Sequence, residues 1–182
     1  MRFALLALLL LAACSTNPVM LHRAREADAP FAFNGRIAIR QDARRDSAGV
    51  RWTHRDGTDE ILLLAPLGQT VARIVHGAEQ TTLEAQGRRY VAQNAEDLMQ
   101  QALGWRLPLS GLRYWIMALP APDGEARIER NANGQVNLLR QQGWEISYTR
   151  YAAESGDALP LRLKLQREGV EVRVLIDEWE AQ

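Results

Sequence analysis

The segment Val50-Arg51-Trp52-Thr53-His54-Arg55 alternates apolar or aromatic side chains with polar ones. Successive side chains of a β-strand point to opposite faces, so this period of two predicts a strand with one buried face. The same alternation returns near the end of the chain, where Val170, Val172, Val174 and Ile176 share one parity. Strands with a single apolar face are typical of an antiparallel sheet.

Similar segments occur throughout the chain at the regular spacing of a meander. The expected strands are residues 33–40, 50–55, 60–64, 69–76, 80–85, 88–92, 126–130, 135–141, 144–151, 160–166 and 170–179. A single sheet of about 11 strands tends to curl on itself. We therefore expect one curved antiparallel sheet.

The middle of the chain has a helical pattern instead. Asn94 can cap a first helix that ends at Gly104, and a second helix is expected after Pro108, capped by Ser110. The apolar positions of the second helix recur at intervals of three and four residues: Leu109, Leu112, Ile116 and Leu119. Two amphipathic helices can cover the concave face of a curled sheet. The sequence thus predicts a mainly β fold, a curved, unclosed antiparallel β-barrel of about 11 strands with a helical lid enclosing an apolar cavity.

The composition excludes several classes of function. The 22 basic and 22 acidic residues balance, whereas a bulk nucleic-acid binder needs a net basic field. One cysteine and three histidines, His22, His54 and His76, form no zinc or disulfide pattern. No G-x-S-x-G, H-E-x-x-H, P-loop or dinucleotide motif is present. We expect no enzyme activity, no metal, no cofactor and no nucleic-acid partner, and we expect a monomer.

The N-terminus indicates export and lipidation. Arg2 precedes a short apolar run that ends in Leu11-Ala12-Ala13-Cys14, which is the lipobox pattern of bacterial lipoproteins. An ordinary signal peptide followed by a chance cysteine is the alternative. The expected organisation is a lipoprotein signal peptide at 1–13, a lipidated tether at 14–30 and a half-barrel domain at 31–182. Ser15 is non-acidic, which by resemblance to lipoproteins in general favours export to the outer membrane.

Large aromatic side chains are candidates for the wall of the cavity. Trp52 and Trp144 share parity with the apolar residues of their strands, and Trp115 adjoins Ile116 on the second helix. Wide, rigid rings can line a pocket for acyl chains, together with the lid residue Leu112. Ordinary core packing is the alternative, and composition does not separate the two.

Leu67 is unusual because it occupies a turn. Ala65-Pro66-Leu67-Gly68 has the proline and glycine of a tight turn, whose tip normally carries polar residues. An exposed leucine at this tip would suit contact with a membrane or a partner. A tip folded back onto the core is the alternative.

Seven features in order along the chain carry a resemblance to a known family. They are the lipobox, Phe33-x-Gly35-Arg36, Pro66-Leu67-Gly68, Leu103-Gly104-Trp105-x-Leu107-Pro108-Leu109, Leu112-x-x-Trp115-Ile116, Gln142-Gly143-Trp144-x-x-x-Tyr148 and Ile176-x-x-Trp179. Together they resemble the LolB family of outer-membrane lipoprotein-localisation proteins. The resemblance implies an unclosed barrel with a helical lid, facing the periplasm and anchored in the outer membrane by its N-terminal acyl chains.

The same resemblance implies a function. Members of the family accept lipoprotein cargo from the periplasmic carrier LolA, hold the acyl chains in an apolar cavity and release them into the inner leaflet of the outer membrane. The family's exposed membrane-targeting leucine corresponds to Leu67, between Pro66 and Gly68. Two other functions remain open: a lipocalin-like binder of free lipids, and a structural outer-membrane lipoprotein that acts as a scaffold.

Overall fold

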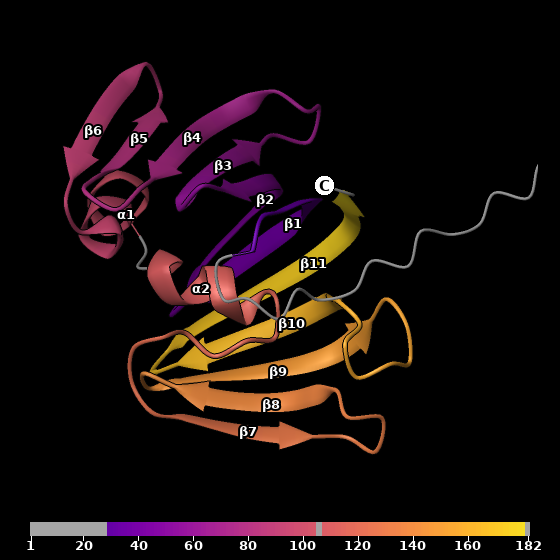
Figure 1. Ribbon diagram of the computed structural model, residues 1–182. Coiled ribbons are helices and arrows are strands. Elements are labelled where there is room, and N and C mark those ends of the chain that lie inside the picture. Colours follow the sequence, from indigo (N-terminus) through magenta and orange to yellow (C-terminus); the bar gives the residue numbers. More distant parts are fainter. Residues whose placement is uncertain (1–28, 105–106, 181–182) are drawn as a thin grey trace, which may run out of the picture.

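The computed structural model describes residues 29–104 and 107–180, which form one sheet and two short helices (Figure 1). The first six strands are β1 (Phe31–Gln41), β2 (Arg44–Arg55), β3 (Thr58–Leu64), β4 (Thr70–His76), β5 (Thr81–Ala85) and β6 (Arg88–Ala92). The helices are α1 (Ala95–Leu103) and α2 (Leu109–Trp115). The remaining strands are β7 (Ala126–Arg130), β8 (Val136–Gln141), β9 (Trp144–Tyr151), β10 (Pro160–Arg167) and β11 (Val170–Glu180).

All 11 strands belong to one antiparallel sheet in the order β6-β5-β4-β3-β2-β1-β11-β10-β9-β8-β7. The two halves of the chain therefore meet where β1 pairs with β11. The sheet curves around α1 and α2, and its edge strands β6 and β7 lie at opposite ends of the molecule (Figure 1). This arrangement confirms the predicted curved, unclosed barrel with a helical lid.

The pairing of β1 with β11 depends on a glycine. The register shifts between Asn34 and Gly35, so the strand carries an irregularity at this point. A Cβ atom at position 35 would overlap the carbonyl oxygen of Leu175 on β11. Glycine is thus the residue that allows the two backbones to approach here.

The apolar faces of the strands and helices meet in one core. Along β2, Val50, Trp52 and His54 are buried while Arg51 and Arg55 are exposed, as the alternation predicts. Leu98 and Met99 of α1, and Leu109 and Leu112 of α2, are fully buried. Burial of each such side chain contributes roughly 1.5–3 kcal/mol, so the helices are held mainly by these contacts.

The first helix begins and ends as the sequence predicts. The side chain of Asn94 accepts hydrogen bonds from the backbone N–H groups of Glu96 (2.8 Å) and Asp97 (3.1 Å). Gly104 follows the helix with a positive φ of 82° and donates to the carbonyl of Gln100. Both caps satisfy backbone groups that a helix end leaves without partners.

The second helix differs from the prediction at both ends. Ser110 does not cap it, because the cap position is Pro108, whose side chain accepts no hydrogen bond. The helix ends at Trp115 instead of continuing to Leu119. Ala118 adopts a positive φ of 54°, and the N–H groups of Ala118 and Leu119 bond back to the carbonyls of Trp115 and Tyr114. These two bonds reverse the chain, in the manner of a helix-ending motif that usually contains glycine.

Candidate apolar interior and exposed turn

The space between the lid helices and the sheet is almost filled. A narrow cavity of about 20 Å³ remains beneath α2, which is room for about one water-sized sphere. The described residues that line it are all apolar: Phe33, Ile37, Val50, Trp52, Ile61, Leu63, Ile74, Met99, Leu107, Leu109, Leu112 and Val174. Pockets that hold ligands have volumes of roughly 300–1,000 Å³. The interior can therefore accept an acyl chain only if the helices move away from the sheet.

Of the residues predicted to form the cavity, Trp52 and Leu112 lie in this lining. Trp52 is held on one side by the rings of Phe31 and Phe33, whose centroids are 5.9 and 6.0 Å away. Its indole Nε1 donates to the carboxylate of Asp59 at 2.9 Å. The ring thus has a fixed orientation, with its apolar face available to the cavity.

Trp115, Ile116 and Trp144 lie outside this lining, in the core beside it. Trp115 is fully buried and donates from Nε1 to Oε1 of Gln141 at 2.9 Å. The rings of Trp115 and Trp144 pack against each other with centroids 6.3 Å apart. The structure therefore separates the predicted set into two cavity-lining residues and an adjoining cluster of three at the end of α2.

Gly111 leaves room for the ring of Trp115, which lies one turn further along the same helix. A Cβ atom at position 111 would lie 2.7 Å from Cη2 of the Trp115 ring. The ring cannot easily move aside, because Gln141 holds its Nε1 and Tyr148 donates to the backbone carbonyl of Trp115 at 2.7 Å. Glycine in the middle of a helix costs about 1 kcal/mol relative to alanine, and here it permits the close packing of helix on ring.

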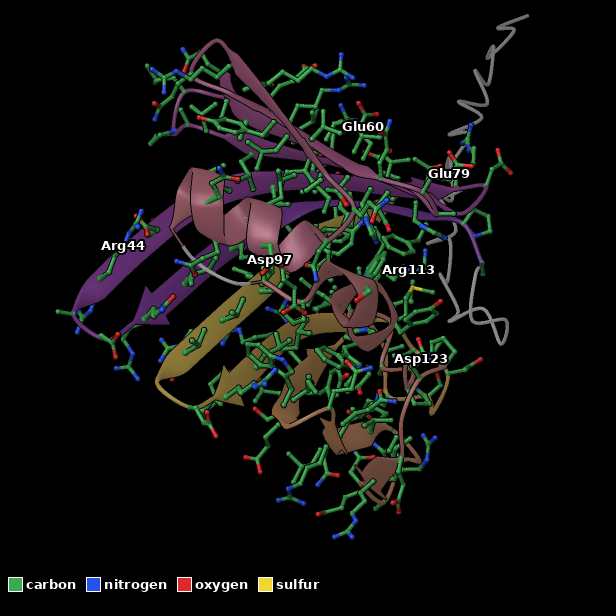
Figure 2. All side chains as sticks on the ribbon, turned by 90° about the vertical axis from the view of Figure 1, so that its left-hand side faces the viewer. Arg44, Glu60, Glu79, Asp97, Arg113 and Asp123 are labelled. Carbon is green, nitrogen blue, oxygen red and sulfur yellow. The ribbon has the colours of Figure 1, made fainter. Side chains whose placement is uncertain are left out.

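A buried polar cluster, absent from the sequence-based prediction, links the lid to the sheet. Asp59 is fully buried at the start of β3 and His54 on β2 is 1% exposed. Nδ1 of His54 lies 2.9 Å from Oδ1 of Asp59, and Nη1 of Arg113, on α2, lies 3.7 Å from Oδ2. Arg113 extends from the lid helix toward the strands (Figure 2). His54 and Asp59 face each other across the β2–β3 hairpin, whereas Arg113 is distant in sequence, and nothing in its local pattern identifies it as their neighbour.

His76 lies near the same cluster. Burial lowers the pKa of the His76 imidazole, the charge of Asp59 raises it, and the charge of Arg113 lowers it. Burial is the largest of these effects, so the pKa is below its ordinary value. Nδ1 of this ring has a hydrogen-bond partner in the hydroxyl of Thr81, at 2.7 Å.

Leu67 projects from the turn between β3 and β4. Its side chain is 86% exposed, which rules out the alternative in which the tip folds back onto the core. The turn is closed by hydrogen bonds from the N–H of Gly68 to the carbonyl of Ala65 (2.8 Å) and from the N–H of Ala65 to the carbonyl of Gln69 (2.9 Å). Val71, just beyond the turn, is 50% exposed. The molecule thus presents apolar surface at one tightly hydrogen-bonded turn.

The predicted lipidation site Cys14 lies outside the residues that the structure describes, as do the predicted signal peptide at 1–13 and residues 14–28 of the predicted tether. Within residues 29–104 and 107–180, no helix has the length and apolar character needed to cross a membrane. Those same residues contain no group of three or more histidine, cysteine, aspartate or glutamate side chains that could hold a metal ion.

The chain is similar in sequence to known proteins over most of its length. A family model described as outer membrane lipoprotein LolB matches residues 29–179. Outer-membrane lipoprotein LolB of Chromobacterium violaceum is 39% identical over 175 residues, which cover 94% of each chain. The LolB of Pseudomonas paraeruginosa is also 39% identical, over 149 residues that cover 81% of this chain and 73% of the relative.

Solved structures show the same fold at low sequence identity. A LolA superfamily protein from Nitrosomonas europaea superposes with a TM-score of 0.51 at 10% identity, covering 87% of this chain and 88% of the other. A putative outer-membrane lipoprotein-sorting protein domain from Vibrio parahaemolyticus gives 0.52 at 8% identity, covering 86% and 87%. The unclosed curved sheet, the two helices that cover it and the apolar residues between them define the class of half-barrel proteins with a helical lid. Within that class, the chain belongs to the LolB family of outer-membrane lipoproteins. It is a lipoprotein-localisation factor of the outer membrane, lipid-anchored and facing the periplasm, and not an enzyme.

Proposed function

We propose that the chain is a receptor that accepts lipoproteins from a LolA-like periplasmic carrier and inserts them into the inner leaflet of the outer membrane. The observation that carries this proposal is the apolar interior closed by two short helices, beside a turn that exposes Leu67. The interior supplies a place for acyl chains, and the turn supplies a contact with the bilayer. Neither step requires a nucleophile, a metal or a cofactor.

The free energy for such a transfer comes from the acyl chains themselves. Each methylene group moved from water to an apolar site contributes about 0.8 kcal/mol, so chains are never released into water. A carrier, a receptor and a bilayer with successively higher affinity can pass them on without ATP. The receptor must then bind the chains in a way that is readily reversed, which suits a lid that has to be displaced.

The lid and its neighbouring cluster define the proposed acyl-chain site. Trp52 and Leu112 line the closed cavity. Movement of α2 away from the sheet would also uncover Trp115, Ile116 and Trp144, so these three side chains border the enlarged space. Apolar rings and branched side chains bind acyl chains without directional bonds, which allows cargo of different sequence to be accepted.

Anchoring is assigned to Cys14. Lipidation of this thiol after removal of residues 1–13 would hold the domain at the membrane, and several acyl chains hold a protein far more firmly than one. Cys14→Ala should abolish incorporation of radiolabelled palmitate and release the domain from the membrane fraction. Absence of label in the wild-type chain would refute the assignment.

The decisive experiment is transfer of a radiolabelled lipoprotein from purified LolA-like carrier to this protein. We expect cargo to move from carrier to receptor, and then to added liposomes. The small volume of the cavity favours a second candidate, a structural lipoprotein with a filled core, which would take up neither cargo nor a hydrophobic fluorophore. A lipocalin-like protein would bind free fatty acid and leave the lipoprotein on the carrier.

A further inference from the structure

A groove on the outer face of the sheet, opposite the lid, is separate from the apolar interior described above. Its volume is about 760 Å³, and it crosses β1, β2, β9, β10 and β11. The basic side chains of Arg36, Arg162, Lys164 and Arg173 stand along it, and none of the described residues in its lining is acidic. Such a concentration of positive charge over a hollow surface favours an anionic partner.

Taken alone, the arrangement of these basic residues destabilises the sheet. Lys164 on β10 lies directly opposite Arg173 on β11 in the pairing register. Arg162, on the same strand, is paired with Arg150 on β9 at an irregularity in the register. Like charges in directly opposed positions of a sheet destabilise it. A feature that opposes local stability in this way is characteristic of a functional surface.

Carboxylates compensate only part of this charge. Arg36 binds Asp177 through Nη2 at 2.8 Å, and Nη2 of Arg173 lies 2.8 Å from Oε1 of Glu171. Within the described ranges, neither Arg162 nor Lys164 has a carboxylate oxygen within 4.0 Å. Two cations on one strand are therefore available to an anion from outside the molecule.

The groove continues into the exposed turn. Leu64 and Pro66 form part of its wall, and Leu67 follows immediately with its side chain in solvent. An apolar tip beside basic side chains is the pattern of a protein surface that lies at the membrane interface, where phosphates sit just outside the acyl region. This continuity with the turn favours a bilayer over a soluble acidic protein.

We propose that this groove binds the phosphate-bearing headgroups of anionic phospholipid while Leu67 enters the adjacent acyl region. The inference rests on the proposed function, because it assumes that the turn meets the bilayer during delivery. Arg162 and Lys164 provide the attraction, whereas Arg36 and Arg173 are already paired with Asp177 and Glu171. The groove would orient the receptor, so that its turn faces the leaflet that receives the cargo.

The test uses the mature chain from residue 14 onward with Cys14→Ser, because an acyl anchor would conceal weaker contacts. Its binding is measured by co-sedimentation with phosphatidylcholine vesicles that contain or lack phosphatidylglycerol. The variant Arg162→Gln/Lys164→Gln should lose roughly 20- to 30-fold in affinity for the anionic vesicles, from about fivefold for each cation. The control Arg127→Gln/Arg130→Gln makes the same change in net charge on the edge strand β7 and should change affinity little. Added salt should weaken wild-type binding far more than variant binding.

Thermal unfolding measurements test whether the variants are folded, and the loss of like-charge repulsion should leave their melting temperature at or above that of the wild type. If the double variant is unfolded, Arg162→Gln alone is used, with an expected loss of about fivefold. Equal loss in the β7 control, unchanged vesicle binding, or loss of carrier binding alone would each overturn the proposal. Failure of cargo transfer with intact vesicle binding would refute the proposed function and leave this inference standing.

Discussion

The guanidinium of Arg113, on the lid helix α2, lies 3.7 Å from the buried carboxylate of Asp59 on β3. Because Asp59 also contacts Trp52 and His54, this one carboxylate joins the lid to the wall of the cavity. Arg113 is 21% exposed and can separate from Asp59 into water. The contact therefore adds a charged, reversible link to the apolar packing that keeps the lid closed.

Loss of this link should make the lid easier to open. Arg113→Gln leaves the fully buried Asp59 carboxylate without the Arg113 charge in the closed state, which costs at least the roughly 1 kcal/mol of an exposed ion pair and enlarges the open population about fivefold or more. A hydrophobic fluorophore should then bind at least about fivefold more tightly. Ser110→Ala is the matched control on the same helix, because Ser110 is exposed and does not cap it. Equal fluorophore affinity in folded Arg113→Gln and wild type would show that the contact does not hold the lid.

Gly35 should be essential for the joining of the two halves of the sheet. Gly35→Ala places a methyl group against the backbone carbonyl of Leu175, which cannot move without disturbing the pairing of β1 with β11. We expect a loss of more than about 2 kcal/mol in the free energy of unfolding, measured with urea. Gly49→Ala is the control, since the nearest atom to its Cβ is the Cβ of Leu64, at 3.2 Å, and the backbone oxygen of Leu64 lies at an ordinary contact distance of 3.6 Å. Similarly small losses of unfolding free energy in both variants would contradict the conclusion that the pairing of β1 with β11 requires Gly35.

The tryptophans should differ in their access to acyl chains. A fatty acid that carries a bromine quencher should quench Trp52, because that ring lines the cavity, more than Trp144, which packs against Trp115. Trp52→Phe should therefore remove most of the quenchable emission, whereas Trp144→Phe should remove less. Quenching that is unaffected by Trp52→Phe would exclude Trp52 from the acyl-chain site.

Local patterns were sufficient to predict most of the fold. The alternation from Val50 to Arg55 located a strand, although the structure extends it back to Arg44 through residues without clear alternation. Asn94 marked the start of α1 by a side-chain cap that depends only on its neighbours. The chain reversal after α2 cannot be predicted in the same way, because it requires a positive φ at Ala118, which alanine seldom adopts.

The site was less accessible to sequence reasoning because it depends on register between distant strands. The sequence predicts that Leu67 lies in a Pro-Leu-Gly turn but leaves open whether its side chain is exposed, which only the structure decides. The meeting of Asp59 with Arg113, and of Lys164 with Arg173, depends on how elements pair and pack after folding. The packing of the Trp115 ring against its own helix likewise depends on Gly111, which no periodic pattern reveals.

The low pKa of His76 predicts a loss of stability in mild acid. Burial, the largest cause, makes the folded protein hold the proton less tightly than the unfolded chain does. As the pH falls through about 6.5, the unfolded chain takes up the proton first, and stability decreases until the lower folded-state pKa is passed. The free energy of unfolding should therefore be smaller near pH 5 than near pH 7. His76→Gln should reduce this difference; an identical pH dependence in both proteins would assign the effect to other groups.

Leu67 should act in delivery and not in acceptance. One leucine contributes about 1.5–3 kcal/mol when buried, which is enough to favour insertion of the turn but too little to anchor the protein. Leu67→Glu should keep the fold, because the side chain is 86% exposed and packs on nothing in the core. The variant should still accept labelled lipoprotein from the carrier, since the turn lies outside the cavity lining. It should then fail to pass the cargo to liposomes, because a carboxylate resists entry into the apolar region of the bilayer. Leu67→Met is the control that keeps an apolar side chain and should deliver cargo normally. Normal delivery by Leu67→Glu would remove the turn from the mechanism, and loss of acceptance by a folded variant would place Leu67 at the carrier contact instead.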